Sequence, residues 1–168
     1  MNTVLITSLV AAAMVLLPAS MPVGARAPME SACVQVTEPQ VAALFNRWND
    51  SLRTGDPDKV LANYAEDGVL LATLSNEPRT SRAAMRDYFV KFLKSKPQGS
   101  IDKRVIKIGC NVAQDLGTYA FKFADGKTVH ARYTYVYEWR NGKWLIAHHH
   151  SSAMPEPMAG ADGAKPRR

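Results

Sequence analysis

The residues best suited to chemistry are three consecutive histidines, His148, His149 and His150, followed directly by Ser151. In an extended strand, alternate side chains point to opposite faces, so the first and third histidines share one face and His149 shares the other with Ser151. Two imidazoles on one face could bind a metal, but a zinc site takes three or four ligands. The next acidic residue along the chain is Glu156, so the sequence predicts no metal site.

The two serines after the histidines are weak candidates for a nucleophile. A histidine and a serine two positions apart on a strand do not form a catalytic pair by default, and no glycine-flanked elbow presents Ser151 or Ser152. Proton abstraction by a histidine paired with a carboxylate is a better enzyme hypothesis. The candidate carboxylates, Asp67 and Asp87, also fit a turn and a helix surface. The sequence therefore leaves the catalytic residues unknown and does not establish that the protein is an enzyme.

His149 is the central candidate for binding a ligand. A neutral imidazole donates and accepts hydrogen bonds near pH 7, and a small shift of its pKa would give it a charge. It therefore suits either binding an acidic group or moving a proton. Ser151 shares its face, and the neighbouring Ala147 is small, which leaves room for a ligand. Trp48 and Tyr64, from the expected helices, should also line the pocket, although Trp48 fits a purely structural place in the core equally well.

The residue that the neighbouring strand contributes depends on the turn between the two strands. The pair Asn141-Gly142 is a strong signal for a tight hairpin. A two-residue loop places Arg132 on the face of His149. A three-residue loop that includes Arg140 shifts the register by one and places Tyr133 there instead. Because a one-residue slip moves every side chain to the opposite face, the sequence leaves this choice open.

Three helices are expected in the first half of the chain. The capping box Thr37–Gln40 opens a long helix with an apolar stripe that ends at Gly55. A short helix follows the pair Asp56-Pro57, where a capping residue precedes proline. The third helix begins after Ser81 and ends at Lys96-Pro97.

Beyond Gly99 the apolar residues change from helical spacing to alternation, which indicates strands. Helices followed by antiparallel strands indicate an α+β fold. A curved sheet around a long helix would enclose a pocket lined by aromatic side chains and a few polar groups. Strands are expected near 69–72, 106–110, 119–123, 128–139 and 143–152.

Composition places the chain among ordinary globular proteins. It has 168 residues, 46% hydrophobic and 21% charged, which suits one domain with a sizeable core. The net charge of +6 is dispersed without a basic stripe, so nucleic acid is not an expected partner. A positive charge does favour an acidic small molecule. The chain has no Gly-x-Gly-x-x-Gly fingerprint, so no dinucleotide cofactor, and no other cofactor, is expected.

The first residues have the composition of a signal peptide. An apolar run from Val4 to Leu17 is followed by small residues up to Ala27. The run is shorter than the ~20 residues that span a bilayer, although a buried N-terminal helix is an alternative. We expect a periplasmic or secreted protein with no membrane contact after processing. The expected organisation is a signal peptide at 1–27, a linker at 28–36, one domain at 37–155 and a disordered tail at 156–168.

The chain has two cysteines, Cys33 and Cys110, and an even number fits an oxidising compartment. A disulfide between them would span 110 − 33 = 77 residues. The alternative is a pair of small buried apolar residues. We predict the disulfide.

The segment from Asn141 to Pro155 resembles the end of the calcium/calmodulin-dependent protein kinase II association domain family, with Asn-Gly-Lys-Trp, then His-x-His, small residues and proline. The resemblance covers roughly Val36 to Pro155. Trp48-Asn49, Tyr64 and the strand around Arg132 resemble the exported bacterial branch. The wider group is similar to the nuclear-transport-factor-2-like superfamily, which includes polyketide-cyclase-like (SnoaL-like) proteins. This implies a cone-shaped fold with three N-terminal helices packed on a curved antiparallel sheet.

The resemblance implies a self-associating domain that binds a small molecule and has no kinase activity of its own. The kinase domain has an arginine-lined pocket for small carboxylates, and two of those arginines fall at Tyr135 and Ser151 here. Since neither residue is basic, that particular site is not expected. The alternative function is an acid–base enzyme, such as an isomerase, cyclase or dehydratase, on the same scaffold.

The expected partner is a second copy of the chain, bound through the outer face of the sheet in a homodimer or a higher homo-oligomer. The apolar residues of that face differ between the two registers. They are Tyr133, Tyr135 and Tyr137 in one register, and Val136, Trp144 and Ile146 in the other.

Overall fold

A computed structural model describes residues 32–156, so the expected signal peptide and all but the first residue of the expected tail lie outside the described residues. Within 32–156, no helix is both long and apolar enough to cross a membrane. The elements are α1 (Glu38–Arg53), α2 (Pro57–Leu61), β1 (Tyr64–Leu71), α3 (Arg82–Phe92), the 3₁₀ turn η1 (Leu93–Ser95), β2 (Gln98–Gly109), β3 (Val112–Lys122), β4 (Thr128–Arg140) and β5 (Lys143–Ala153).

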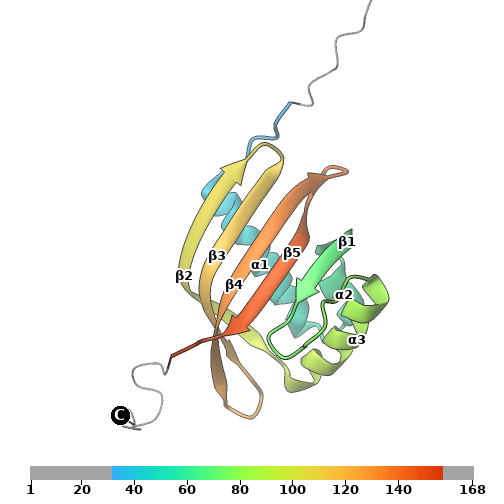
Figure 1. The fold of residues 1–168 in the computed structure, drawn as a ribbon, viewed down its shortest axis with the longest axis vertical. Coiled ribbons are helices and arrows are strands. Elements are labelled where there is room, and N and C mark those ends of the chain that lie inside the picture. Colours follow the sequence, from blue (N-terminus) through green and yellow to red (C-terminus); the bar gives the residue numbers. More distant parts are fainter. Residues whose placement is uncertain (1–31, 157–168) are drawn as a thin grey trace, which may run out of the picture. The chain divides into compact units, whose positions relative to one another are not determined.

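The five strands form one curved sheet in the order β1-β5-β4-β3-β2. Strands β2 to β5 are antiparallel neighbours, and β1 joins β5 as a parallel edge strand. Helix α1 crosses behind the strands, on the opposite side from the viewer (Figure 1). The expected α+β fold, with three helices packed on a curved sheet, is confirmed.

The helices begin where local capping predicts. The Gln40 side chain accepts a 2.8 Å hydrogen bond from the Thr37 backbone N–H, which opens α1. Asp56 accepts from the Asp58 N–H at 2.9 Å at the start of α2. At the start of α3, Ser81 Oγ accepts a 3.2 Å hydrogen bond from the backbone N–H of Ala84, the third residue of the helix. These caps satisfy backbone donors that no helical carbonyl can reach.

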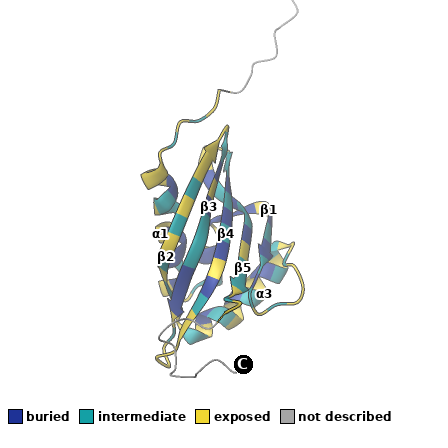
Figure 2. Cartoon of the chain, turned by 60° about the vertical axis from the view of Figure 1, so that its left-hand side comes forward, coloured by how far each residue is buried: buried dark blue, intermediate teal, exposed yellow. Residues whose placement is uncertain are grey.

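The core lies between α1 and the inner face of the sheet. Buried and less buried residues alternate along most of β4, so one face of this strand is turned inward (Figure 2). Phe45 of α1 packs against Tyr119, Tyr133 and Tyr135, with ring centroids 6.1–6.5 Å apart. Tilted and edge-on aromatic contacts of this kind add to the stabilisation from buried area. Trp48, the next aromatic residue of the stripe, is 1% exposed.

The hairpin between β4 and β5 has the two-residue loop. Asn141 and Gly142 have φ values of 51° and 78°, as a type I′ turn requires. Trp139 therefore pairs with Trp144. Further along, Tyr137 pairs with Ile146 but Val136 pairs with His148, so Ala147 is an extra residue. This is a β-bulge, and it changes the register by one.

The bulge overturns the face expected from the two-residue loop. Tyr133 pairs with Ser151 and Tyr135 with His149, all on the inner face. Arg132, expected on that face, is exposed on the other side and donates to Ser152 Oγ at 3.2 Å. The arrangement is the one expected from a three-residue loop, although the loop itself has two residues.

Strand β1 also adjusts at this point. Its pairing with β5 passes from Tyr64↔Ile146 to Val69↔His148, with an irregular stretch between. Gly68, expected in a turn, lies inside that stretch. A Cβ there would come within 3.0 Å of the Ile146 carbonyl oxygen, so only glycine fits without a shift. Tyr64, expected in a helix, is the first residue of β1.

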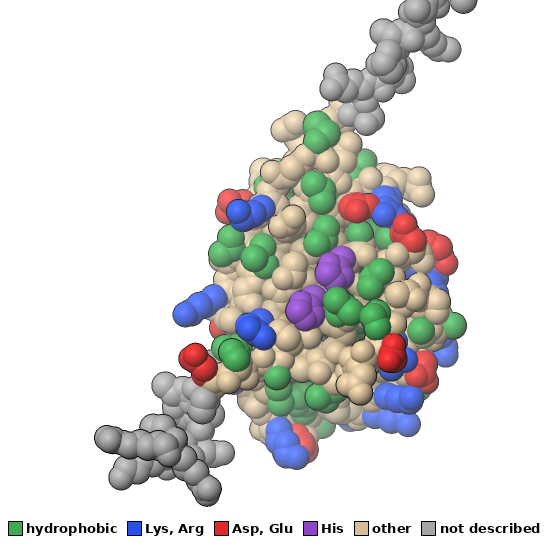
Figure 3. All heavy atoms as spheres, in the orientation of Figure 1, with side chains coloured by type: hydrophobic (Ala, Val, Ile, Leu, Met, Phe, Trp, Pro, Cys, Tyr) green, Lys and Arg blue, Asp and Glu red, His purple; other side chains and the backbone are tan. Residues whose placement is uncertain are grey.

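The outer face of the sheet differs from both sequence-based versions. All three tyrosines of β4 point inward and are buried, and so are Trp144 and Ile146. Of the residues expected on the outer face in either register, only Val136 lies there, and it is partly exposed. Histidine side chains lie near the middle of this face with hydrophobic ones around them, and most charged side chains lie toward its margins (Figure 3).

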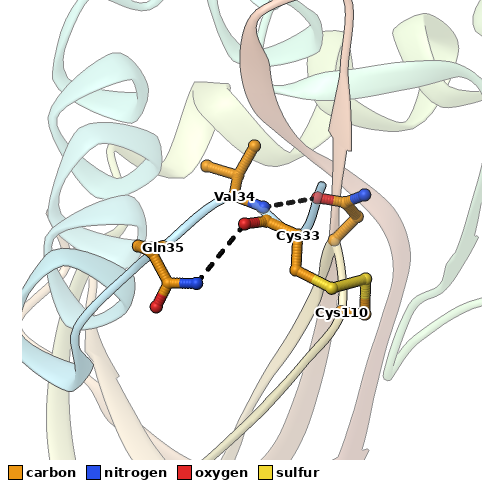
Figure 4. Close-up of a disulfide and its surroundings, with 5 residues drawn as sticks. Cys33, Val34, Gln35 and Cys110 are labelled. Atoms are coloured by element: carbon orange, nitrogen blue, oxygen red, sulfur yellow. Dashed lines mark hydrogen bonds between the residues drawn. A yellow bond between two sulfur atoms is a disulfide. The ribbon is translucent and has the colours of Figure 1, made fainter. Parts of the chain in front are cut away.

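The expected disulfide between Cys33 and Cys110 is present (Figure 4). It joins the segment before α1 to the turn between β2 and β3. The Val34 backbone N–H donates to Asn111 Oδ1 at 2.9 Å, which reinforces the same junction. A disulfide is the bond expected in an oxidising compartment.

Replacing both Cys33 and Cys110 by serine should lower the free energy of unfolding by about 2–4 kcal/mol, because the unfolded chain regains the freedom of a large loop. Urea denaturation at pH 7 measures the loss. Wild-type protein treated with dithiothreitol is the matched control and should lose the same amount. Equal stability of the oxidised wild type and the double variant would contradict a stabilising disulfide.

Candidate functional site

A cavity of about 700 Å³ lies between α3, the end of α1 and the inner face of the sheet. Most of its wall is apolar, as expected of a small-molecule site. Leu70 of β1 and Ala131 of β4 contribute to it on the sheet side. The aromatic side chains of the wall are Trp48, Tyr88, Phe89, Phe92, Tyr119, Phe121 and Phe123.

A cluster of three hydroxyl groups forms part of the cavity wall on the sheet side, and we call it the hydroxyl floor. Tyr119 OH donates to Ser151 Oγ at 2.7 Å, and the hydroxyls of Thr73 and Ser151 are 2.5 Å apart. Burial raises the pKa of the Tyr119 phenol, so this group keeps its proton near pH 7. The hydroxyl floor is therefore neutral and can donate or accept hydrogen bonds.

His149 lies beside the hydroxyl floor and is 4% exposed. Its ring stacks on Tyr135 at a centroid distance of 4.1 Å and meets Trp48 edge-on at 5.4 Å. Burial lowers the pKa of His149 to about 3, and the adjacent His148 and His150 act in the same direction. His149 is therefore neutral near pH 7 and does not supply the charge that sequence reasoning allowed.

The hydrogen bond between Tyr64 and His149 favours one position of the ring proton. Tyr64 OH lies 2.8 Å from Nδ1. Burial raises the pKa of Tyr64 well above its ordinary value, so its hydroxyl proton stays in place and needs an acceptor. Nδ1 can accept it only when the proton of the neutral ring is on Nε2. Among the described residues Nε2 has no partner, so His149 carries a buried, unpaired N–H donor.

The structure brings some of the expected site residues together. Trp48, His149 and Ser151 all line the cavity. Tyr64 does not line it but holds His149 from behind.

Two other expected residues lie elsewhere. Tyr133 is on the inner face but outside the cavity, where its hydroxyl donates to Asp115 Oδ1 at 2.7 Å. Arg132 is on the outer face. Sequence reasoning missed Tyr119 and Thr73; the alternation from Tyr119 to Phe123 was the signal that could have placed the tyrosine inside.

The carboxylates named as possible partners of a histidine base are on the surface. Asp67 pairs with Arg140, and Asp87 pairs with Lys91 at 3.0 Å. The fully buried carboxylate Asp115 is bound by Arg104 and Tyr133 rather than by His149. Within residues 32–156 no His, Cys, Asp and Glu group of three or more is placed to hold a metal ion.

The stability of the protein should fall below pH 6.5 because of His149. The unfolded chain binds a proton near pH 6.5, whereas the folded pKa is about 3, so acid favours the unfolded state by about 1.4 kcal/mol per pH unit in this window. Urea denaturation at pH 6.5 and pH 5 should show that wild type loses about 2 kcal/mol more than His149→Phe. Equal losses in the two proteins would show that His149 titrates normally.

Comparison with known proteins gives one family. The model of the calcium/calmodulin dependent protein kinase II association domain matches residues 37–155. A crystal structure of such a domain from Xanthomonas campestris is 51% identical, covers 73% of this chain and 91% of its own, and superposes with a TM-score of 0.69.

Two further solved structures are more distant. The iota-carbonic anhydrase of a cyanobacterium, complexed with bicarbonate, is 25% identical over 73% of this chain and 94% of its own, with a TM-score of 0.64. A protein of unknown function from Pseudomonas putida, similar to nuclear transport factor 2, is 20% identical over 77% and 96%, with a TM-score of 0.63. The latter likeness confirms the expected nuclear-transport-factor-2-like fold.

Proposed function

We propose that this chain, which belongs to the calcium/calmodulin dependent protein kinase II association domain family, binds a small, largely apolar molecule in its cavity and associates with further copies of itself. The binding half of the proposal is carried by the unpaired Nε2 donor of His149. We assign the domain no kinase activity, and we place the protein in the periplasm or outside the cell, where its disulfide would persist.

The unpaired donor has an energetic consequence. A buried N–H without an acceptor costs about 1–3 kcal/mol relative to a paired one. Nε2 is buried, so a ligand that displaces the side chains covering it and brings a carbonyl or similar acceptor to it would recover this free energy. The aromatic walls would supply the rest of the affinity by burying the apolar part of the ligand. These features together favour a ligand with an apolar body and a hydrogen-bond acceptor at its inner end.

Self-association is supported by the family and by the outer face of the sheet. Leu116, Val136 and Leu145 lie on that face and are partly exposed, next to His148 and His150. Apolar area of this kind is typical of an interface. A second copy that meets the same face through a two-fold axis would cover both patches at once.

A second candidate function is an acid–base enzyme on the same scaffold. It is favoured by the 25% identity to a carbonic anhydrase complexed with bicarbonate, because the hydroxyls of Thr73, Tyr119 and Ser151 could bind a small oxyanion. An isomerase or dehydratase is less well supported, since the partner of His149 is Tyr64 and not a carboxylate. A stopped-flow assay of CO₂ hydration distinguishes this candidate from binding alone.

A matched pair of probes tests the binding proposal. 2-Acetylnaphthalene carries a carbonyl acceptor, and 2-ethylnaphthalene has nearly the same shape without one. Wild type should bind the acetyl compound about fivefold more tightly, because one neutral hydrogen bond to a buried donor is worth about 1 kcal/mol. Quenching of tryptophan fluorescence measures both affinities.

His149→Phe should abolish this preference while still binding both probes. The control is His150→Phe, the same substitution on the opposite face of the strand, which should retain the preference. The proposal fails if neither probe binds wild type saturably, or if the preference survives in His149→Phe.

The second part of the proposal, self-association, predicts that the protein is a dimer or a larger oligomer at micromolar concentration. Val136→Glu places a charge in the middle of the apolar outer face and should give monomers, because a desolvated unpaired charge is costly at an interface. Val90→Glu, at an exposed position of α3, is the control and should leave assembly unchanged. Sedimentation velocity measures both, and a monomeric wild type would refute this half.

A further inference from the structure

The polar groups of the cavity differ in charge between its interior and its mouth. The interior groups, His149 and the hydroxyl floor, are all neutral. Arg79 and Lys91 also line the cavity, and their side chains are 28% and 70% exposed, so they lie at its mouth. A ligand in this cavity therefore meets neutral donors at one end and cationic groups at the other.

The backbone holds Arg79 in place. Its N–H donates to the Leu70 carbonyl at 2.9 Å, and its carbonyl accepts from the Leu70 N–H at 3.0 Å. Leu70 is a buried residue of the cavity wall. The Arg79 side chain also donates to Ser75 Oγ at 3.2 Å. The Arg79 backbone is therefore fixed against the cavity wall, and its guanidinium is held by Ser75.

The acidic groups near the mouth do not cancel its positive charge. Asp87 lies 3.0 Å from Lys91 Nζ and 3.9 Å from Arg79 Nη1, so one carboxylate serves two cations. Asp125, also on the cavity wall, pairs with Lys127 at 3.4 Å. The cations Arg79, Lys91 and Lys127 outnumber the carboxylates Asp87 and Asp125 by one, which leaves one positive charge.

The field of Arg79 reaches the wall of the cavity. Burial raises the pKa of the Tyr88 phenol to about 12, and the charge of Arg79 opposes this rise. In the interior, by contrast, no cation contacts His149 or Ser151 through a described hydrogen bond or ion pair. An ionised group placed there would be desolvated with no cation beside it to compensate.

We propose that the ligand of this cavity is an amphipathic acid that binds with its neutral acceptor inward, at His149, and its anionic group outward, at Arg79 and Lys91. This rests on the binding function proposed above and adds the class and the orientation of the ligand. Phe92, Phe121 and Phe123 line the cavity, with ring centroids 5.6–6.4 Å apart. They form an apolar wall suited to the body of such a molecule.

Two fluorescent probes with the same apolar body separate charge from shape. 1-Anilinonaphthalene-8-sulfonate carries an anionic group, and N-phenyl-1-naphthylamine is the same molecule without it. Titrations should count only the fluorescence that excess 2-acetylnaphthalene displaces, which restricts the measurement to the cavity. Wild type should bind both probes, and only binding of the sulfonate should weaken when salt rises from 50 to 500 mM, as expected for an ion pair.

Arg79→Gln should weaken the sulfonate about fivefold and change the affinity for the neutral probe less than twofold, because a charge-assisted contact is lost and the wall is kept. Lys91→Gln should act in the same direction with a smaller effect, since Lys91 is more exposed. The control is Arg82→Gln, which removes an arginine of α3 that pairs with Glu66 and does not line the cavity. It should leave both affinities unchanged, and melting curves should show that all variants fold.

Unchanged sulfonate binding in Arg79→Gln would overturn the proposal, because the anion would then not be held at the mouth. An equal loss for both probes would also overturn it, since Arg79 would then shape the wall and supply no charge. In either case, the proposed binding function stays intact if the neutral probe binds wild type in the cavity. If neither this probe nor 2-acetylnaphthalene binds wild type, the binding function itself is wrong.

Discussion

The extra residue in β5 controls which side chains reach the interior of the domain. Ala147 is skipped in the pairing of β5 with β4, and pairing with β1 is irregular at the same point. Without the bulge, the two-residue turn would pair Tyr135 with His148, and His149 would point outward together with Ser151. The bulge therefore lets a tight turn coexist with His149 and Ser151 on the inner face, and both the cavity and the outer face that carries His148 and His150 depend on it.

The environment of His149 limits what it can do. Stacked on Tyr135 and bonded to Tyr64, the ring is kept neutral by loss of solvent rather than by a charged neighbour. A group in this state is a poor proton acceptor near pH 7 but a well-oriented hydrogen-bond donor, because its tautomer is set by the tyrosine behind it. This favours recognition over acid–base chemistry.

Charged groups in the domain are kept apart from this donor. The buried carboxylate of Asp115 is bound by Arg104 and Tyr133, outside the cavity, and the cations of the cavity lie at its exposed mouth. In a medium of low dielectric constant an isolated charge is costly, whereas a paired or partly hydrated one is not. The separation explains how one cavity can offer an apolar wall, a neutral interior and a positive mouth.

Local patterns in the sequence determined the α+β class, the three helix starts and the place of the hairpin turn at Asn141-Gly142, because caps, alternation and turn residues act over a few positions. The even number of cysteines predicted the disulfide. Local patterns also placed His149 with Ser151, since this follows from strand periodicity alone. The partner of His149 and the choice between Arg132 and Tyr133 came only from the tertiary structure. A bulge is a compromise between strands that are distant in sequence, and one inserted residue reverses every face beyond it.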